Sequence, residues 1–184
     1  MNKKISLAGD LGSGKTTIGD ILTKEYNLKK VSVGEFLREM ATEHGMDVLT
    51  FNTYMESHPE FDKILDDRLK SYEHKDGDFL FDSRLAWHFV PSSFKVYMTV
   101  DPVTAAKRIM GANRATESYE NVEEAAKKIK ERRKSENQRY ENLYGVEIQN
   151  MQNYDLVVDT NGRTPEEVAS VIIDGFEKWL NTKR

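Results

Sequence analysis

The sequence predicts an α/β fold: a parallel five-stranded sheet with helices on both faces, arranged in three layers. Three observations lead to this class. About five short apolar runs alternate with segments of helical periodicity, which is typical of parallel sheets. A glycine-rich stretch joins the first of these strands to the first helix. The 184 residues, of which 38% are hydrophobic and 32% charged, are enough for one soluble domain with a substantial core.

In the first half of the chain, strands are expected where apolar residues run together or alternate. Helices are expected where apolar residues recur every three or four positions. Pro59 favours a helix start directly after it. The expected elements are, in order, a strand at 4–8, a helix at 17–26, a strand at 28–32 and helices at 34–43, 49–55 and 61–72.

The second half continues this alternation and ends in a helix with a well-defined start. Thr164 is expected to cap that helix, with Pro165 at its first position and Glu167 completing a capping box. The expected elements are, in order, strands at 79–81 and 94–100, helices at 105–110 and 121–143, a strand at 154–159 and a final helix from 165 onward.

No repeat, linker or low-complexity segment divides the chain, so we expect residues 1–184 to form a single domain. Two stretches, 34–75 and 111–145, carry more helices than a simple alternation needs. We interpret them as insertions that could close over a site. The remaining core comprises 1–33, 76–110 and 146–184.

The glycine-rich stretch is the G-x-x-x-x-G-K-T signature of a phosphate-binding loop (P-loop), placed between a strand and a helix as this motif requires. Glycines let the backbone approach phosphate oxygens, and the loop N–H groups attract negative charge. Lys15 supplies a positive charge for the β and γ phosphates, and the Thr16 hydroxyl is an oxygen ligand for Mg²⁺. The residues expected to bind a nucleoside triphosphate are Gly9, Asp10, Leu11, Gly12, Ser13, Gly14, Lys15, Thr16 and Thr17.

A second magnesium ligand is expected where a strand ends, because open parallel sheets bind ligands beyond the carboxyl ends of their strands. Asp82 ends an apolar run, and its carboxylate can hold Mg²⁺ directly or through water. Asp101 is the rival, although Asp101-Pro102 fits a turn and a helix start more simply. Ser32 ends the second strand and is expected at the same edge.

Arginines are the next signal, because phosphoryl transfer mainly requires positive charge around the moving phosphate. Arg38 follows the second strand, and Arg84 comes shortly after the expected metal ligand. The spacing of Arg132, Glu136 and Arg139 places all three on one helical face. From spacing alone, a solvated helix with charge pairs between successive turns is the stronger interpretation of that last group.

In this order, the motifs resemble those of the nucleoside monophosphate kinases, most of all the short archaeal-type branch of the cytidylate kinases. The similarity extends over nearly the whole chain, from Ile5 to the last helix. It rests on the P-loop, residues 32–38, Asp82-Ser83-Arg84, the spacing of Arg132, Glu136 and Arg139, and residues 154–160; residues 58–62 and 139–145 also match.

The resemblance implies phosphoryl transfer from ATP to CMP or dCMP, with Mg²⁺ as the metal cofactor. It implies that 34–75 binds the monophosphate and that 111–145 is a lid. Arg38 and Arg84 are then expected to hold the acceptor phosphate, while Arg132 and Arg139 reach both phosphates. The expected catalytic residues are Lys15, Arg84, Arg132 and Arg139.

The same resemblance implies the remaining site residues. Arg108 is expected against the adenine of ATP, and Thr160 at the border of the adenine site. Ser83 stands where the family pattern has glycine, and Glu136 where it has the shorter aspartate, so both bear on base specificity. The acceptor side comprises Ser32, Arg38, Asp82, Ser83, Arg84 and Glu136.

Composition disfavours other classes of protein. A net charge of −4 argues against a general nucleic-acid binder, and no apolar run is long enough to span a membrane. The absence of cysteine and of a signal-like N-terminus indicates a cytoplasmic protein, expected to act as a monomer on small nucleotides. Adenylate, uridylate and shikimate-type kinases remain alternatives within enzymes, and a nucleotide-binding switch is the alternative from another class.

Overall fold

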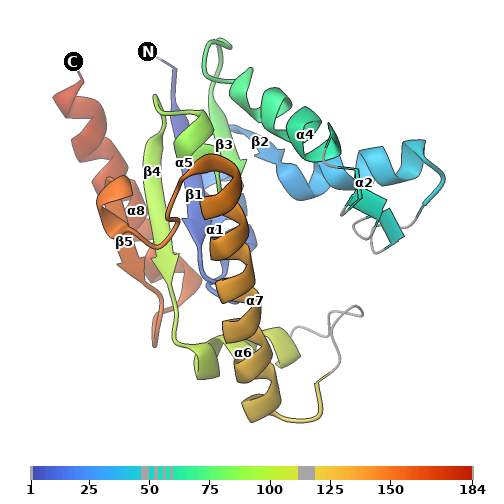
Figure 1. The fold of residues 1–184 in the computed structure, drawn as a ribbon. Coiled ribbons are helices and arrows are strands. Elements are labelled where there is room, and N and C mark those ends of the chain that lie inside the picture. Colours follow the sequence, from blue (N-terminus) through green and yellow to red (C-terminus); the bar gives the residue numbers. More distant parts are fainter. Residues whose placement is uncertain are drawn as a thin grey trace.

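The computed structural model describes residues 2–46, 50–51, 54–55, 57–58, 60–111 and 119–183, with the side chain of Ser135 left out. Its five strands form one sheet in the order β2-β3-β1-β4-β5, and every pair is parallel. The predicted α/β class and parallel sheet are therefore confirmed (Figure 1). The strands are β1 (Lys4–Gly9), β2 (Lys29–Ser32), β3 (Phe79–Asp82), β4 (Phe94–Thr99) and β5 (Leu156–Asp159).

The helices agree with the expected order, and two short elements were not anticipated. The helix α5 and the 3₁₀ turn η1 have too few residues to show a periodic apolar pattern. The expected helix at 49–55 and the expected insertion at 111–145 lie partly outside the described residues, and Pro59 lies wholly outside them. The helices are α1 (Lys15–Tyr26), α2 (Val33–Glu43), α4 (Glu60–Lys70), α5 (Ala86–Phe89), α6 (Pro102–Gly111), α7 (Val122–Tyr144) and α8 (Pro165–Thr182), and η1 covers Met151–Asn153.

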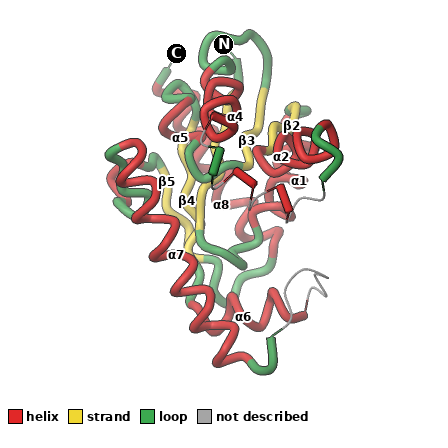
Figure 2. The backbone as a smooth tube through the Cα atoms, turned by 45° about the vertical axis from the view of Figure 1, so that its right-hand side comes forward, coloured by secondary structure: helices red, strands yellow, loops and turns green. Residues whose placement is uncertain are grey.

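Alternate residues of each strand point to opposite faces of the sheet, so each face has its own core. On one face, α1 packs over β1, β2 and β3, and α8 packs over β4 and β5. On the other face, α2 contacts β2 and α5 contacts β1 and β4, and α4 packs on both of these helices. The three-layer arrangement is visible in Figure 2. The first core contains Ile5, Leu7, Ile18, Leu22, Phe94, Val96, Met98, Ile172 and Phe176, and the second contains Val31, Phe36, Met40, Leu65, Leu69, Phe79, Phe81 and Trp87.

The long helix α7 runs from α6, at the carboxyl end of the sheet, back along the molecule (Figure 1). Its first turns pack on α6 through small side chains, which allow close approach of the two helices; these include Ala105, Ala106, Ala125 and Ala126. The chain ends lie at the opposite end of the sheet from α6 (Figure 1). The P-loop and α7 therefore meet at the end of the sheet where the strands finish.

The predicted start of α8 is confirmed in detail. The Thr164 hydroxyl accepts from the Glu167 backbone N–H at 3.2 Å, and the Glu167 carboxylate accepts from the Thr164 backbone N–H at 2.8 Å. Among the described helices, none is long and apolar enough to cross a membrane.

Candidate active site

The P-loop requires glycine at two positions for steric reasons. A Cβ built on Gly9 would lie 2.4 Å from the Met98 carbonyl oxygen, and one on Gly12 would lie 2.8 Å from the Ala105 Cα. Both residues, and Gly14, have positive φ angles, which favour glycine. The loop therefore folds tightly between β4 and α6, and its N–H groups lie at the start of α1.

Lys15 lies under this loop rather than in open solvent. Its ammonium donates to the backbone carbonyls of Gly9 and Asp10, both at 2.9 Å. Burial, and to a lesser extent the nearby Arg84 guanidinium, lower the pKa of Lys15 to about 8. The charge of Lys15 is therefore poorly compensated in this structure, and an anion placed beside it would stabilise the charged form.

A cavity of about 450 Å³ opens in front of the P-loop, and we call it the transfer chamber. It gathers the predicted residues from four separate parts of the chain, because the parallel strands all end here. Its polar lining comprises Lys15, Thr16 and Thr17 from the P-loop and α1, Ser32 and Arg38 from β2 and α2, Asp82 and Arg84 from the end of β3, and Arg132 from α7.

The transfer chamber has the donors that a magnesium ion needs. Thr16 and Asp82 both line it and offer a hydroxyl and a carboxylate, which are hard oxygen ligands. Among the described residues, no three acidic or histidine side chains gather as a metal cage. This fits Mg²⁺ in a phosphoryl-transfer site, where water and substrate phosphates supply most of the ligands.

A second cavity of about 810 Å³ continues from the transfer chamber, and we call it the acceptor chamber. Gly34, Arg84 and Arg132 line both cavities and so mark their junction. Beyond the junction the lining combines apolar side chains with charged and hydroxyl groups. It includes Leu37, Met55, Leu65, Leu69 and Leu85, together with Asp62, Asp66, Ser83, Glu136, Arg139, Tyr140 and Tyr144.

Glu136 links the two arginines at the junction. Its Oε1 lies 2.6 Å from Arg84 Nη1 and 3.1 Å from Arg132 Nε, so one carboxylate pairs with both guanidinium groups. Arg139 lines the same chamber three residues further along α7. The spacing argument for a shared face therefore holds, and that face lines a cavity.

Helix α4 lies within the stretch 34–75 that was expected to bind the monophosphate, but none of its residues was singled out from the sequence. Asp62 and Asp66, four residues apart, both line the acceptor chamber. Tyr144 of α7 donates a hydrogen bond to Asp66 Oδ2. Among the described residues, none donates to the other carboxylate oxygen of Asp66. Burial raises the pKa of Asp66, against the hydrogen bond from Tyr144, so a further donor would stabilise its ionised form.

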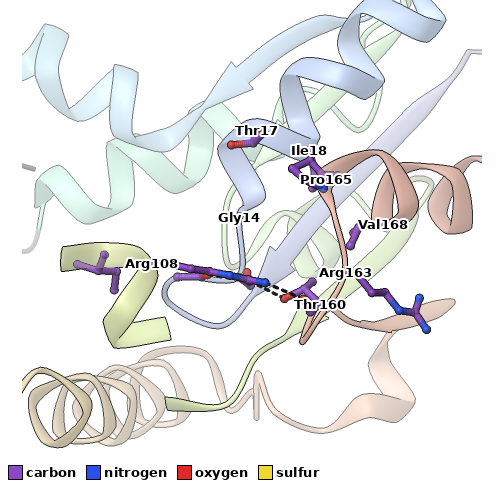
Figure 3. Close-up of a pocket in the computed structure, with 11 residues that line it drawn as sticks. Gly14, Thr17, Ile18, Arg108, Thr160, Arg163, Pro165 and Val168 are labelled. Carbon is purple, nitrogen blue, oxygen red and sulfur yellow. Dashed lines mark hydrogen bonds between the residues drawn. The ribbon is translucent and has the colours of Figure 1, made fainter. Parts of the chain in front are cut away.

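A third cavity of about 290 Å³ lies on the other side of the P-loop, and we call it the donor pocket (Figure 3). Arg108 from α6 reaches across it and donates to the Thr160 hydroxyl at 3.0 Å and to the Thr160 carbonyl at 2.7 Å. The Ser13 hydroxyl lines the pocket, is buried, and has no hydrogen-bond partner among the described residues. The other lining residues are Gly12, Gly14, Thr17, Ile18, Ile109, Arg163, Pro165 and Val168.

Two predicted residues lie differently from the simplest expectation. The carboxylate of Asp10 turns away from the P-loop cavities into the protein, where Tyr97 and Val100 donate to it, so only its backbone belongs to the loop. Arg38 lines the transfer chamber but is exposed. Leu11 and Gly9 contribute backbone and packing to the loop, as the motif implies.

Known proteins of similar sequence indicate the family of this chain. Residues 4–162 match the cytidylate kinase-like family. A cytidylate kinase of Thermoplasma volcanium is 36% identical over 95% of this chain and 92% of its own length. A protein of Lacinutrix mariniflava named S-adenosylmethionine-dependent nucleotide dehydratase is 35% identical over 97% of this chain, which spans only 37% of that protein.

Solved structures agree on the fold. A shikimate kinase from Aquifex aeolicus superposes with a TM-score of 0.60 over 95% of this chain and 96% of its own, at 20% identity. This similarity bears on the architecture alone. With a family match over most of the chain and full-length relatives named cytidylate kinases, the chain belongs to the cytidylate kinase-like family and is a nucleoside monophosphate kinase-like transferase.

Proposed function

We propose that this chain transfers the γ-phosphoryl group of ATP to CMP or dCMP. The observation that carries the proposal is the junction between the two chambers. Arg84 and Arg132 face both the transfer chamber, with Lys15 and Thr16, and the acceptor chamber. A phosphate at this junction would lie next to the P-loop, with room behind it for a nucleoside.

The roles of the residues follow from their positions. The P-loop and Lys15 would hold the β and γ phosphates, and Thr16 and Asp82 would hold Mg²⁺, which neutralises phosphate charge when bound. The guanidinium groups of Arg84 and Arg132 would hold the acceptor phosphate. One of its oxygens forms the new bond to the γ-phosphorus while the bond to the β-phosphate oxygen breaks and ADP leaves.

Glu136 is proposed to orient the arginines rather than to act as a base. The acceptor phosphate is already ionised at neutral pH, so no general base is needed. Its shared contact with Arg84 and Arg132 holds both groups at the junction. When the acceptor phosphate binds the two guanidinium groups, it would take the place of the Glu136 carboxylate. The carboxylate would then either keep its contact with one arginine or accept a hydrogen bond from a ribose hydroxyl.

Arg139 is proposed on the acceptor side, since it lines that chamber and not the transfer chamber. Arg38 and Ser32 line the transfer chamber and would help hold the acceptor phosphate. The donor pocket would take the adenine of ATP, with Arg108 and Thr160 at its edge.

The preference for cytosine is proposed from Asp66. It lines the acceptor chamber but not the transfer chamber, so it lies toward the base end of a bound monophosphate. Its free carboxylate oxygen can accept from the exocyclic amine of cytosine. Uracil presents a carbonyl oxygen at that place, which the carboxylate would repel.

The test is the initial rate of ADP release from Mg-ATP with CMP, dCMP, UMP, AMP and shikimate as acceptors. Fast turnover confined to CMP and dCMP is the expected result. Turnover with AMP, UMP or shikimate instead would keep phosphoryl transfer but overturn the base assignment. ATP binding with no turnover of any acceptor would favour a nucleotide-binding switch. Monomeric behaviour in solution, which we also propose, is checked by light scattering.

A further inference from the structure

A partly buried ion pair joins the P-loop to α7 beside the catalytic chambers. Asp10 Oδ1 lies 2.9 Å from Arg133 Nη2, and the Asp10 side chain is 6% exposed. The same oxygen accepts from the Tyr97 hydroxyl at 2.8 Å, while Oδ2 accepts from the Val100 N–H at 3.1 Å. Burial and the Asp10 carboxylate both raise the pKa of Tyr97, so its hydroxyl stays a donor to Asp10.

The pair lies beside the proposed catalytic groups on α7, since Arg133 and Arg132 point about 100° apart around the helix axis. Arg133 and Asn137 are four residues apart and line a small cavity beside the P-loop, whose wall also includes Arg84, Arg132 and Glu136. Asn137 donates to Gln149 at 2.8 Å, which ties the same face to the segment after α7. Arg132 and Glu136 each precede one of these anchors by one residue and line the acceptor chamber.

In this arrangement, the rotation of α7 about its own axis determines the direction in which the Arg132 side chain points. Neighbouring residues on a helix point about 100° apart, so holding Arg133 against the P-loop determines where Arg132 points. Asp10 belongs to the same loop whose carbonyls hold Lys15. This ion pair, together with the packing of Leu11 against the core between α6 and α7, therefore ties α7 to the loop that would hold the ATP phosphates.

We propose that Asp10 and Arg133 are positioning residues, whose ion pair fixes α7 against the P-loop and keeps Arg132 and Glu136 aimed at the junction of the two chambers. Neither side chain lines the transfer chamber, so neither acts by touching a phosphate. Measurements of kcat test this proposal only if the proposed kinase function holds. Hydrogen–deuterium exchange tests it independently of that function.

Arg133→Gln is the first variant, because Asp10 keeps two donors, Tyr97 and Val100, when Arg133 is lost. We expect kcat to fall about 10- to 100-fold, since a misplacement of about 1 Å at a reacting group can cost that much. The KM for ATP should change less than about threefold. Arg133→Lys retains a charge at this place and should recover most of kcat.

Lys134→Gln is the matched control. Lys134 is the next residue on α7, exposed, and lines none of the cavities described above. It should leave kcat within about twofold of the parent protein. A double variant with Asp10→Asn and Arg133→Gln should be no less active than the less active of the two single variants, because both changes break the same contact.

Hydrogen–deuterium exchange supplies a readout without turnover. In Arg133→Gln, the P-loop and the second half of α7 should lose protection together, and Lys134→Gln should change neither. An unchanged kcat, additive losses in the double variant, or a loss explained by the unfolded fraction alone would overturn the proposal. If no acceptor turns over in the parent protein, the kinase proposal fails. The exchange result then still decides whether the ion pair of Asp10 and Arg133 positions α7.

Discussion

The donor pocket and the acceptor chamber differ in how the chain builds them. The donor pocket uses the P-loop, the start of α1, α6 and the turn between β5 and α8. The acceptor chamber is made mainly by α2, α4 and α7, which lie in the two stretches predicted to be insertions. The P-loop backbone contributes much of the first, whereas the second combines apolar side chains with paired charged ones.

This difference suggests a division of labour. A P-loop binds any triphosphate through backbone N–H groups and one lysine, so its geometry needs little support from elsewhere. The acceptor chamber must choose one base and hold its phosphate, which needs side chains such as Asp66 and Arg84 at defined places. The four predictions below test the two regions, starting with the largest expected effect.

Arg84→Ala should lower kcat by about 100- to 1000-fold, because a charge-stabilising donor at the reacting group is lost. The Kd for ATP should stay within about threefold, since the P-loop is untouched. Both are measured, by ADP release and by titration with an ATP analogue. Arg68→Ala, which removes an exposed arginine paired with Glu39, is the control. Loss of ATP affinity together with kcat would place Arg84 in the donor site instead.

Asp66→Asn should lower the ratio of kcat/KM for CMP over UMP by about 10- to 50-fold, because the amide can also donate to a carbonyl oxygen. The ratio is measured from initial rates with each acceptor. Asp67→Asn is the matched control, since Asp67 is on the same helix, exposed and paired with Lys70. Equal ratios in the parent protein and Asp66→Asn would remove Asp66 from base recognition.

ATP binding should weaken about tenfold between pH 7 and pH 9. The pKa of Lys15 in the free protein is about 8, whereas bound phosphates would keep the ammonium charged. Binding above pH 8 then requires proton uptake, so affinity falls as the pH rises. The Kd is measured by calorimetry across this range. Lys15→Arg stays charged and should show a flat profile; a parallel decline in both proteins would point to another group.

Thr164→Ala should lower the free energy of unfolding by about 1 kcal/mol, the usual worth of an N-cap. The cap stabilises α8, whose first turn borders the donor pocket, yet Thr164 itself lines none of it. Denaturant unfolding measures the change, and kcat should stay the same. Thr182→Ala, near the end of α8, is the control. A large change in ATP affinity would mean that the cap shapes the pocket directly.

Most of the fold could be predicted from the sequence because its signals are local. The apolar runs define β1 to β5, and the capping box at Thr164 defines the start of α8. The P-loop is likewise contained in eight consecutive residues. Helix α5 escaped prediction, since four residues hold less than two turns and its burial depends on neighbours distant in sequence.

The candidate site likewise contains some features that are local in the sequence and others that depend on contacts between distant residues. The sequence by itself determined the P-loop, Lys15 and the shared face of Arg132 and Glu136, because each depends on spacing within one element. Only the tertiary structure decided that Asp66 faces the acceptor chamber and that Asp10 turns inward to Arg133. Those contacts join residues 78 and 123 positions apart, and no local pattern encodes which distant helix will lie opposite a given side chain.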